Sequence, residues 1–222
     1  AFVTIWAVAT ITFFLMNLVP GGPFLSEKAI SPAATKALEA KYGLDKPMAE
    51  RYFTYISDAA HGDFGDSLKQ RGRTVMDIIA TKFPVSARLG GMAVVLALCV
   101  GVPLGVLAAY KRGTFIDSLF SVIATCGIAV PGFVICTLLL YVFGVKLQWL
   151  PTLGLKNAQS YIMPVVALAA YPTSYIMRLM RSSMLDVLGQ DYMRTAKAKG
   201  LSQKVSLFKH ALRNAILPVI TY

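Results

Sequence analysis

The sequence predicts an all-α protein whose helices cross a membrane as a polytopic transmembrane bundle. Hydrophobic residues make up 56% of the 222 residues and charged residues only 15%, whereas a soluble domain is about 45–50% apolar. The apolar residues gather in stretches that approach the roughly 20 residues a helix needs to cross a bilayer. Three cysteines lie within such stretches, where a thiol behaves as a small hydrophobe, so no disulfide framework is predicted.

The apolar stretches and their boundaries divide the chain into nine expected elements. The first stretch ends at "VPGGP" and has no basic leader or A-x-A-like cleavage site, so it is interpreted as a span that starts before Ala1, rather than as a signal peptide. In chain order we expect transmembrane helix 1 (1–19), an extracytoplasmic helical segment (20–87), transmembrane helix 2 (88–110), a cytoplasmic loop (111–117), transmembrane helix 3 (118–144), an extracytoplasmic loop (145–160), transmembrane helix 4 (161–180), a cytoplasmic loop (181–213) and the start of transmembrane helix 5 (214–222).

Lysine and arginine are sorted between the two sides of the predicted membrane. The loop "YKRGTFID" carries adjacent basic residues, and residues 178–213 contain eight basic residues against two aspartates. An even number of crossings separates these loops, so they share a side, and the positive-inside rule makes that side the cytoplasm. Residues 20–87 on the opposite side hold nine basic and eight acidic residues. Nucleic-acid binding would not sort charge by membrane side, so the net charge of +11 predicts topology instead.

The outer segment contains two helical patterns. "SPAATKALEAKYGL" predicts a helix with Ser31 as N-cap and Gly43 just past its end. "KPMAERYFTYISDAAHGDFG" predicts a second helix with Tyr52 and Tyr55 on one face. His61 near its end invites a metal-site interpretation, but a single histidine at a helix end is more often a solvated or capping residue.

The segment "DYMRTAKAKG" between two apolar stretches combines small and basic residues. On a helical wheel Tyr192, Ala196 and Gly200 recur at four-residue spacing and form one narrow face. Small residues let another backbone approach closely, which predicts a docking helix. A solvated positive-inside loop is the alternative interpretation of the segment taken alone.

The residues around this segment resemble a family. "DYMRTAKAKGLSQKVSLFKHALRNAILPVI" resembles the cytoplasmic EAA loop of bacterial ABC importer permeases, in the version carried by the oligopeptide, dipeptide and nickel permeases. The general pattern has Glu-Ala-Ala followed by Gly after three residues. Here Arg194-Thr195-Ala196 leads to Gly200, so the glutamate is absent and only the second alanine and the glycine match.

Other motifs extend the resemblance over nearly the whole chain. "FLMNLVPGGPF" is similar to the family's exit from the first span, and "YGLDKPMAERYFTYISDAAHGDFGDSL" resembles its outer signature. "AVPGFVICTLLLYVFGVKLQWLPTLG" looks like its third span and the following Trp-Leu-Pro turn. The long outer segment before span two resembles the first of the two permease subunits. The resemblance implies the type I permease fold of ABC importers.

The resemblance also implies a division of labour between subunits. The sequence has no Walker A motif, so no cofactor is expected in this chain, and ATP and Mg would be bound by a partner ATPase. The expected partners are a second permease subunit, ATP-binding subunits, an extracytoplasmic solute-binding protein and membrane lipid, without nucleic acid. The helical patterns and near-neutral charge of residues 20–87 predict a folded cap that helps to dock the solute-binding protein, and a cap that only covers the outer ends of the spans is the alternative. The implied ATPase-coupling residues are Tyr192, Arg194, Thr195, Ala196, Lys197, Lys199 and Gly200.

Prolines within the predicted spans suit a chain whose helices move, because each removes a backbone donor and permits a kink. A purely structural role is the alternative, since proline is frequent in membrane helices. The gating or kink candidates are Pro103, Pro131, Gly132, Pro164 and Pro172.

We therefore expect a non-catalytic permease subunit in the bacterial inner membrane, which moves di- or oligopeptides by alternating access. Import of nickel, a small chelate or a peptide-like solute by the same architecture is the alternative substrate interpretation. A membrane-embedded enzyme or a channel is the alternative class, but the sequence shows no intramembrane catalytic pair and no His-Glu-x-x-His motif.

Overall fold

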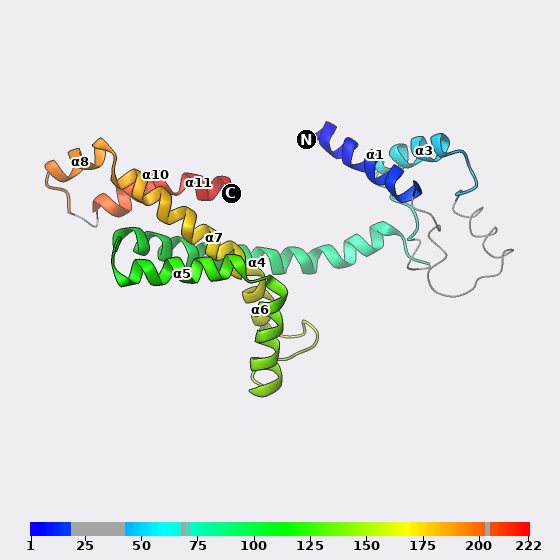
Figure 1. Cartoon of the computed structure of the whole chain (residues 1–222). Helices are drawn as coiled ribbons and strands as arrows, with labels where there is room; N and C mark the ends of the chain where they lie inside the picture. The colour runs from blue at the N-terminus through cyan, green and yellow to red at the C-terminus, as the bar shows by residue number, and fades with distance from the viewer. Residues whose placement is uncertain (19–42, 68–69, 71, 203–204) are drawn as a thin grey trace. The chain divides into compact units, whose positions relative to one another are not determined.

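The computed structural model describes residues 1–18, 43–67, 70, 72–202 and 205–222 (Figure 1). The chain divides into two compact units, Ala1–Pro84 and Val85–Tyr222. Apart from an isolated antiparallel bridge between Asp66 and Thr74, the regular elements in the described residues are helical, which confirms the all-α class. The helix expected to begin at Ser31 lies outside the described residues, except for Gly43, which has a φ of 63°.

In the first unit, α1 (Phe2–Leu18) packs against α3 (Met48–Ala60) through aromatic side chains. Phe13 stacks on Tyr55 at 5.5 Å between ring centroids, and the Tyr52 hydroxyl lies 2.8 Å from Thr10 Oγ1. Arg51 donates a hydrogen bond to the side-chain oxygen of Asn17. The aromatic face predicted on 47–61 is therefore turned toward α1.

Helix α4 (Val75–Tyr110) passes from the first unit into the second, beginning well before the expected start at residue 88. Within the described residues, α4 and the continuous helical stretch Ala158–Leu188 are each long and apolar enough to cross a membrane. A third crossing is possible if the bent pair Phe115–Ala129 and Gly132–Lys146 forms one span, while α1 is apolar but shorter.

The expected third span is bent, because α5 (Phe115–Ala129) and α6 (Gly132–Leu139) meet at an angle of 100°. Val130, the C-cap of α5, is extended with a φ of −80° and a ψ of 122°, and Pro131 follows as the N-cap of α6. α6 continues into a π-helix, Leu140–Lys146 (η1). The sequence predicted the place of the kink, but the bend is sharper than a kinked single helix.

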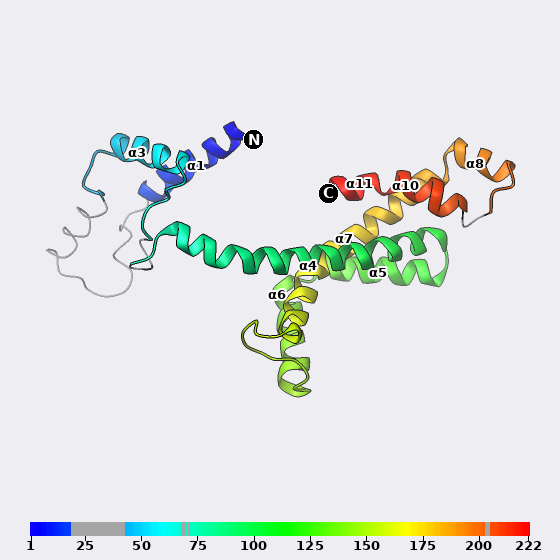
Figure 2. The same cartoon turned by 180° about the vertical axis from the view of Figure 1, so that it is seen from behind.

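Helix α7 (Ile162–Leu188), preceded by the 3₁₀ turn Ala158–Tyr161 (η2), lies at the centre of the second unit. It is followed by α8 (Asp191–Ala198), the π-helix Ser206–Ala211 (η3), α10 (Leu212–Ala215) and α11 (Leu217–Thr221). Both views show α4 and α5 side by side, joined by a tight loop (Figures 1 and 2).

Glycines let α4 and α7 approach closely. A Cβ added at Gly101 would lie 2.9 Å from the Thr173 carbonyl oxygen, and one added at Gly105 would lie 2.6 Å from the Met177 carbonyl oxygen. Such small-residue contacts are the usual means by which membrane helices pack. Sequence analysis did not identify this interface, although Ala97, Gly101 and Gly105 recur at four-residue spacing.

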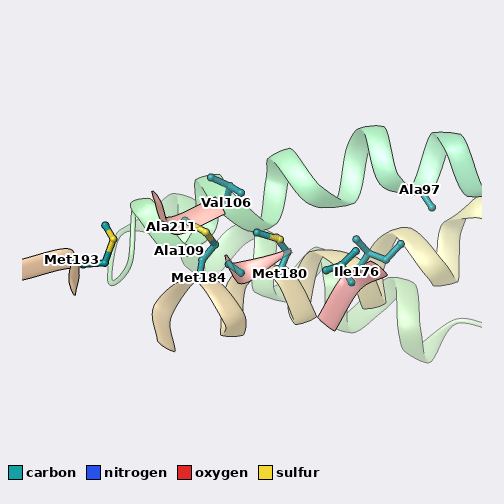
Figure 3. Packing of buried hydrophobic residues seen from close by; sticks show 10 residues of the cluster. Ala97, Val106, Ala109, Ile176, Met180, Met184, Met193 and Ala211 are labelled. Carbon is teal, nitrogen blue, oxygen red and sulfur yellow. The ribbon is translucent and has the colours of Figure 1, made fainter. Parts of the chain in front are cut away.

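The core of the second unit gathers at the end of α7 that leads into α8. Met180 and Met184 are fully buried, and Figure 3 shows them pointing from α7 among residues of α4 and the C-terminal helices. Met193 from α8 belongs to the same cluster. α8 is therefore attached to the bundle through its apolar residues.

Candidate coupling site

Helix α8 begins immediately after α7 through a short turn. Gly189 and Gln190 separate the two helices, and Gln190 N donates to the Val187 carbonyl at 3.1 Å. Met193 N donates back to the Gln190 carbonyl at 3.0 Å, which starts α8. Only two residues therefore connect α8 to the end of α7.

The inner face of α8 packs on the chain itself. Met193 is 1% exposed and Ala196 is 8% exposed, and their spacing of three residues places them on one side of the helix. This differs from the expectation that Ala196 belongs to a small-residue face open to a partner. The small size of Ala196 serves the approach of α8 to its own bundle.

Tyr192 fastens α8 to the segment that follows it. Asn214 in α10 donates a hydrogen bond from Nδ2 to the Tyr192 hydroxyl at 2.9 Å. Sequence reasoning placed Tyr192 on the docking face and assigned no role to Asn214. The two residues are 22 positions apart and lie in different helices. A helical wheel relates residues within one helix, so it could not pair them.

Gly200 lies beyond α8, where it terminates the helix. Its φ of 75° is in the left-handed region that favours glycine. Leu201 N donates to the Ala196 carbonyl at 3.3 Å, the bond that closes a helix end around a left-handed glycine. A Cβ added at Gly200 would meet nothing within 4 Å. The glycine is thus explained by backbone conformation within this chain, and the expected stripe of Tyr192, Ala196 and Gly200 is not one continuous open face.

The outer face of α8 is polar and exposed. Arg194 and Asp191 form an ion pair of 3.6 Å between Nη1 and Oδ1, but both side chains are well exposed, so the pair adds little stability. Thr195 Oγ1 donates to the Asp191 carbonyl, and Lys199 is exposed at the end of the helix. The side chain of Lys197 lies outside the described part of the chain. The exposed polar residues on this face include Asp191, Arg194, Thr195 and Lys199.

A buried ion pair joins α7 to α5 near this site. Arg181 donates from Nε and Nη2 to the two carboxylate oxygens of Asp117 at 2.6 and 2.8 Å. The Asp117 side chain is 7% exposed and that of Arg181 31%. Gly113 N also donates to Asp117 at 3.0 Å, which ties the α4–α5 loop to the pair. Sequence analysis counted Arg181 only as a topology charge and missed the pair.

The proline candidates occupy different backbone settings. Pro103 lies within continuous α4 and Pro172 within α7. Pro164 is in the first turn of α7, where a missing N–H costs little. Among these candidates, a break between two helices occurs at Pro131 and Gly132. Their role in gating stays a prediction.

The described residues contain no group of three or more side chains suited to hold a metal ion. His61 follows the end of α3, and its Nδ1 lies 2.8 Å from the Ser57 carbonyl oxygen, to which an Nδ1–H donates. This is the geometry of a helix-end hydrogen bond.

Comparison with known proteins identifies the kind of protein that carries this site. Residues 101–222 match the family described as binding-protein-dependent transport system inner membrane component. The chain belongs to this family. This inner membrane component is 44% identical over 221 residues to the oligopeptide transport system permease protein OppB of Salmonella typhimurium, covering 99% of the chain and 72% of that protein.

Two further relatives are dipeptide transport system permease proteins named DppB. The protein of Bacillus subtilis is 44% identical over 218 residues, covering 98% of this chain and 71% of its own length. The protein of Lactococcus lactis is 38% identical over 218 residues, covering 98% and 72%. The predicted family, the non-catalytic nature of this inner membrane component and its location in the inner membrane are confirmed.

Proposed function

We propose that this permease subunit provides part of the path for di- or oligopeptides in an ATP-driven importer. The observation that carries the proposal is the identity of 44% to proteins named oligopeptide and dipeptide transport permeases, over 98–99% of the chain. Its partners are a second permease subunit, ATP-binding subunits that bind ATP and Mg, and an extracytoplasmic solute-binding protein. Residues 20–87 face outward and residues 181–213 face the cytoplasm.

In this proposal α8 receives the motion of the ATPase on its polar outer face. Arg194 and Lys199 are exposed cations that suit acidic groups on a partner, while Met193 and Ala196 hold the opposite face to the bundle. Motion then passes into α7 across a two-residue turn. From α7 it reaches α5 through the Arg181–Asp117 pair.

Reconstitution of the whole transporter in liposomes tests the substrate class. We expect ATP-dependent uptake of labelled di- or oligopeptides that requires the solute-binding protein. Uptake of a nickel chelate without uptake of any peptide would instead support the alternative substrate. Peptide flux without added ATP or binding protein would contradict the importer mechanism.

Charge reversal on α8 tests the coupling role. Arg194→Glu with Lys199→Glu should reduce stimulation of ATP hydrolysis by the loaded binding protein, because it places anions opposite an acidic partner surface. Lys111→Glu with Arg112→Glu on the neighbouring α4–α5 loop is the matched control, with two exposed charges reversed on the same predicted side. If both variants reduce the stimulation of ATP hydrolysis equally, the result would contradict a specific coupling role for α8.

A further inference from the structure

Helix α7 has one exposed stripe, although it lies at the centre of its unit. α5, α6, α10 and α11 contact it, and α4 approaches it through Gly101 and Gly105. The exposed residues recur at spacings of three and four, as one face of a helix requires. We define the α7 stripe as Leu168, Tyr171, Tyr175, Arg178, Ser182 and Asp186.

The α7 stripe lies opposite the residues that form the core. Ile176, Met180 and Met184 point from α7 into the buried cluster (Figure 3). Steps of 100° per residue place Tyr171, Tyr175 and Arg178 on the other side of the helix. The stripe is therefore the face that this unit leaves uncovered.

Aromatic rings are stacked along this uncovered face. Tyr171 and Tyr175 stack at 6.4 Å between centroids, and Tyr222 stacks on Tyr175 at 4.5 Å. Tyr171 is 48% exposed and Tyr175 37%. Neither hydroxyl forms a hydrogen bond with a described residue, so both phenols have donor and acceptor capacity left for another molecule.

The depth of these tyrosines argues against contact with lipid. At 1.5 Å per residue, Tyr171 and Tyr175 lie about 14 and 20 Å along α7 from Ile162, within a hydrocarbon core of about 30 Å. Tyrosines that anchor a helix at the lipid headgroups lie at its ends instead. An unpaired hydroxyl is unfavourable in hydrocarbon, because nothing there can form a hydrogen bond with it, so this face requires water or a polar partner.

Arg178 continues the stripe toward the end of α7 that leads into α8. It lies about 24 Å along the helix from Ile162, and it has no ion-pair partner among the described residues. Arg178 is near the predicted cytoplasmic end of the span, where a charged side chain reaches the membrane surface or a water-filled cavity. Membrane helices pack closely where their facing residues are small. The tyrosines and the arginine of the stripe are bulky, so this face is not suited to close packing against another helix.

We propose that the α7 stripe lines the translocation path and contacts the passing peptide, an inference that rests on the proposed function. The ring faces of Tyr171 and Tyr175 accept apolar side chains of varied shape, and their hydroxyls exchange hydrogen bonds with peptide N–H and C=O groups. Arg178 attracts the terminal carboxylate of the peptide. Ring stacking and backbone hydrogen bonding depend little on side-chain identity, which suits a path that passes many sequences.

Cysteine labelling in the assembled transporter tests the location of the stripe. Cys99, Cys126 and Cys136 are first replaced by alanine, and cysteine is then introduced by Tyr171→Cys or Tyr175→Cys. Val122→Cys on α5 and Val95→Cys on α4 are matched controls, because both valines are exposed on apolar helices. A charged methanethiosulfonate should label the stripe at least about tenfold faster than the controls, since the reactive thiolate forms where water reaches.

Two labelling results would overturn the proposal. Equal rates at the stripe and at both valines would mean that the stripe faces lipid. Fast labelling of the chain expressed alone, lost when the second permease subunit is present, would mean that the stripe is a subunit interface. Neither measurement requires a substrate, so each remains valid if the peptide function is wrong.

Protection by peptide tests the occupant. In a transporter whose parent form takes up peptide, a transported peptide should slow labelling at Tyr171→Cys and Tyr175→Cys by several fold, and leave labelling at Val122→Cys unchanged. Unchanged labelling at both stripe positions during transport would overturn peptide contact. Tyr175→Phe should retain more uptake than Tyr175→Leu, and equal losses in correctly assembled variants would contradict a role for the ring.

Discussion

Arg181 Nε and Asp117 Oδ1 lie 2.6 Å apart, although 64 residues separate them in the sequence. The pair joins the end of α7 that precedes α8 to the first turn of α5, and the Gly113 amide completes it. α8 follows α7 after two residues, so α7 is joined at its end to the candidate coupling helix and by this pair to α5.

Removal of one partner of this pair should destabilise the protein strongly. We expect Arg181→Ala to cost about 3 kcal/mol, the low end of the range for breaking a buried pair, because Arg181 is partly open to solvent. Arg194→Ala removes the exposed pair on α8 and should cost less than about 1 kcal/mol. Thermal unfolding in detergent measures the stability of the two variants. Similar losses of stability would show that the Arg181–Asp117 pair stabilises the protein no more than an exposed pair does.

The contact between α4 and α7 should be sensitive to a single methyl group. Gly105→Ala places a Cβ against the Met177 carbonyl oxygen and should destabilise the protein by about 1–3 kcal/mol. Gly91→Ala is the matched control in the same helix, because a Cβ there meets nothing within 4 Å. It should be neutral or stabilising by up to about 1 kcal/mol. A neutral Gly105→Ala in the same unfolding assay would mean that the two helices separate readily.

Two substitutions at Gly200 distinguish backbone conformation from partner contact. Gly200→Leu should cost about 1–2 kcal/mol, because a bulky residue is strained in the left-handed region, and should weaken coupling between ATP hydrolysis and uptake. Gly200→Asn should retain most coupling, since asparagine tolerates this conformation. Stimulation of ATP hydrolysis and uptake are measured together in liposomes. If asparagine uncouples as fully as leucine, side-chain bulk at a partner contact is responsible instead.

The predicted topology can be tested at two exposed serines. In a chain without its native cysteines, a membrane-impermeant thiol reagent applied to intact cells should label Ser57→Cys on α3. The reagent should reach Ser202→Cys, beyond α8, only after the cells are permeabilised. The positive-inside distribution of lysine and arginine is the physical reason. The reverse pattern would overturn the orientation and the cytoplasmic location of α8.

The sequence by itself determined the properties that depend on composition and on neighbours a few residues apart. Apolar stretches predicted the helical membrane class, and Pro131, one of the kink candidates, lies at the break before α6. Helix formation and termination rest on hydrogen bonds between residues three to five positions apart, so local patterns report them.

The tertiary structure decided which face of each helix is used. A helical wheel shows that Met193 and Ala196 share a side, but only the packing of α8 on its own bundle shows that this side is buried. The Asp117–Arg181 pair and the exposed α7 stripe depend in the same way on contacts between segments far apart in the chain. Residues distant in sequence leave no periodic signal of which partner they meet, and this is why three-dimensional packing alone revealed these features.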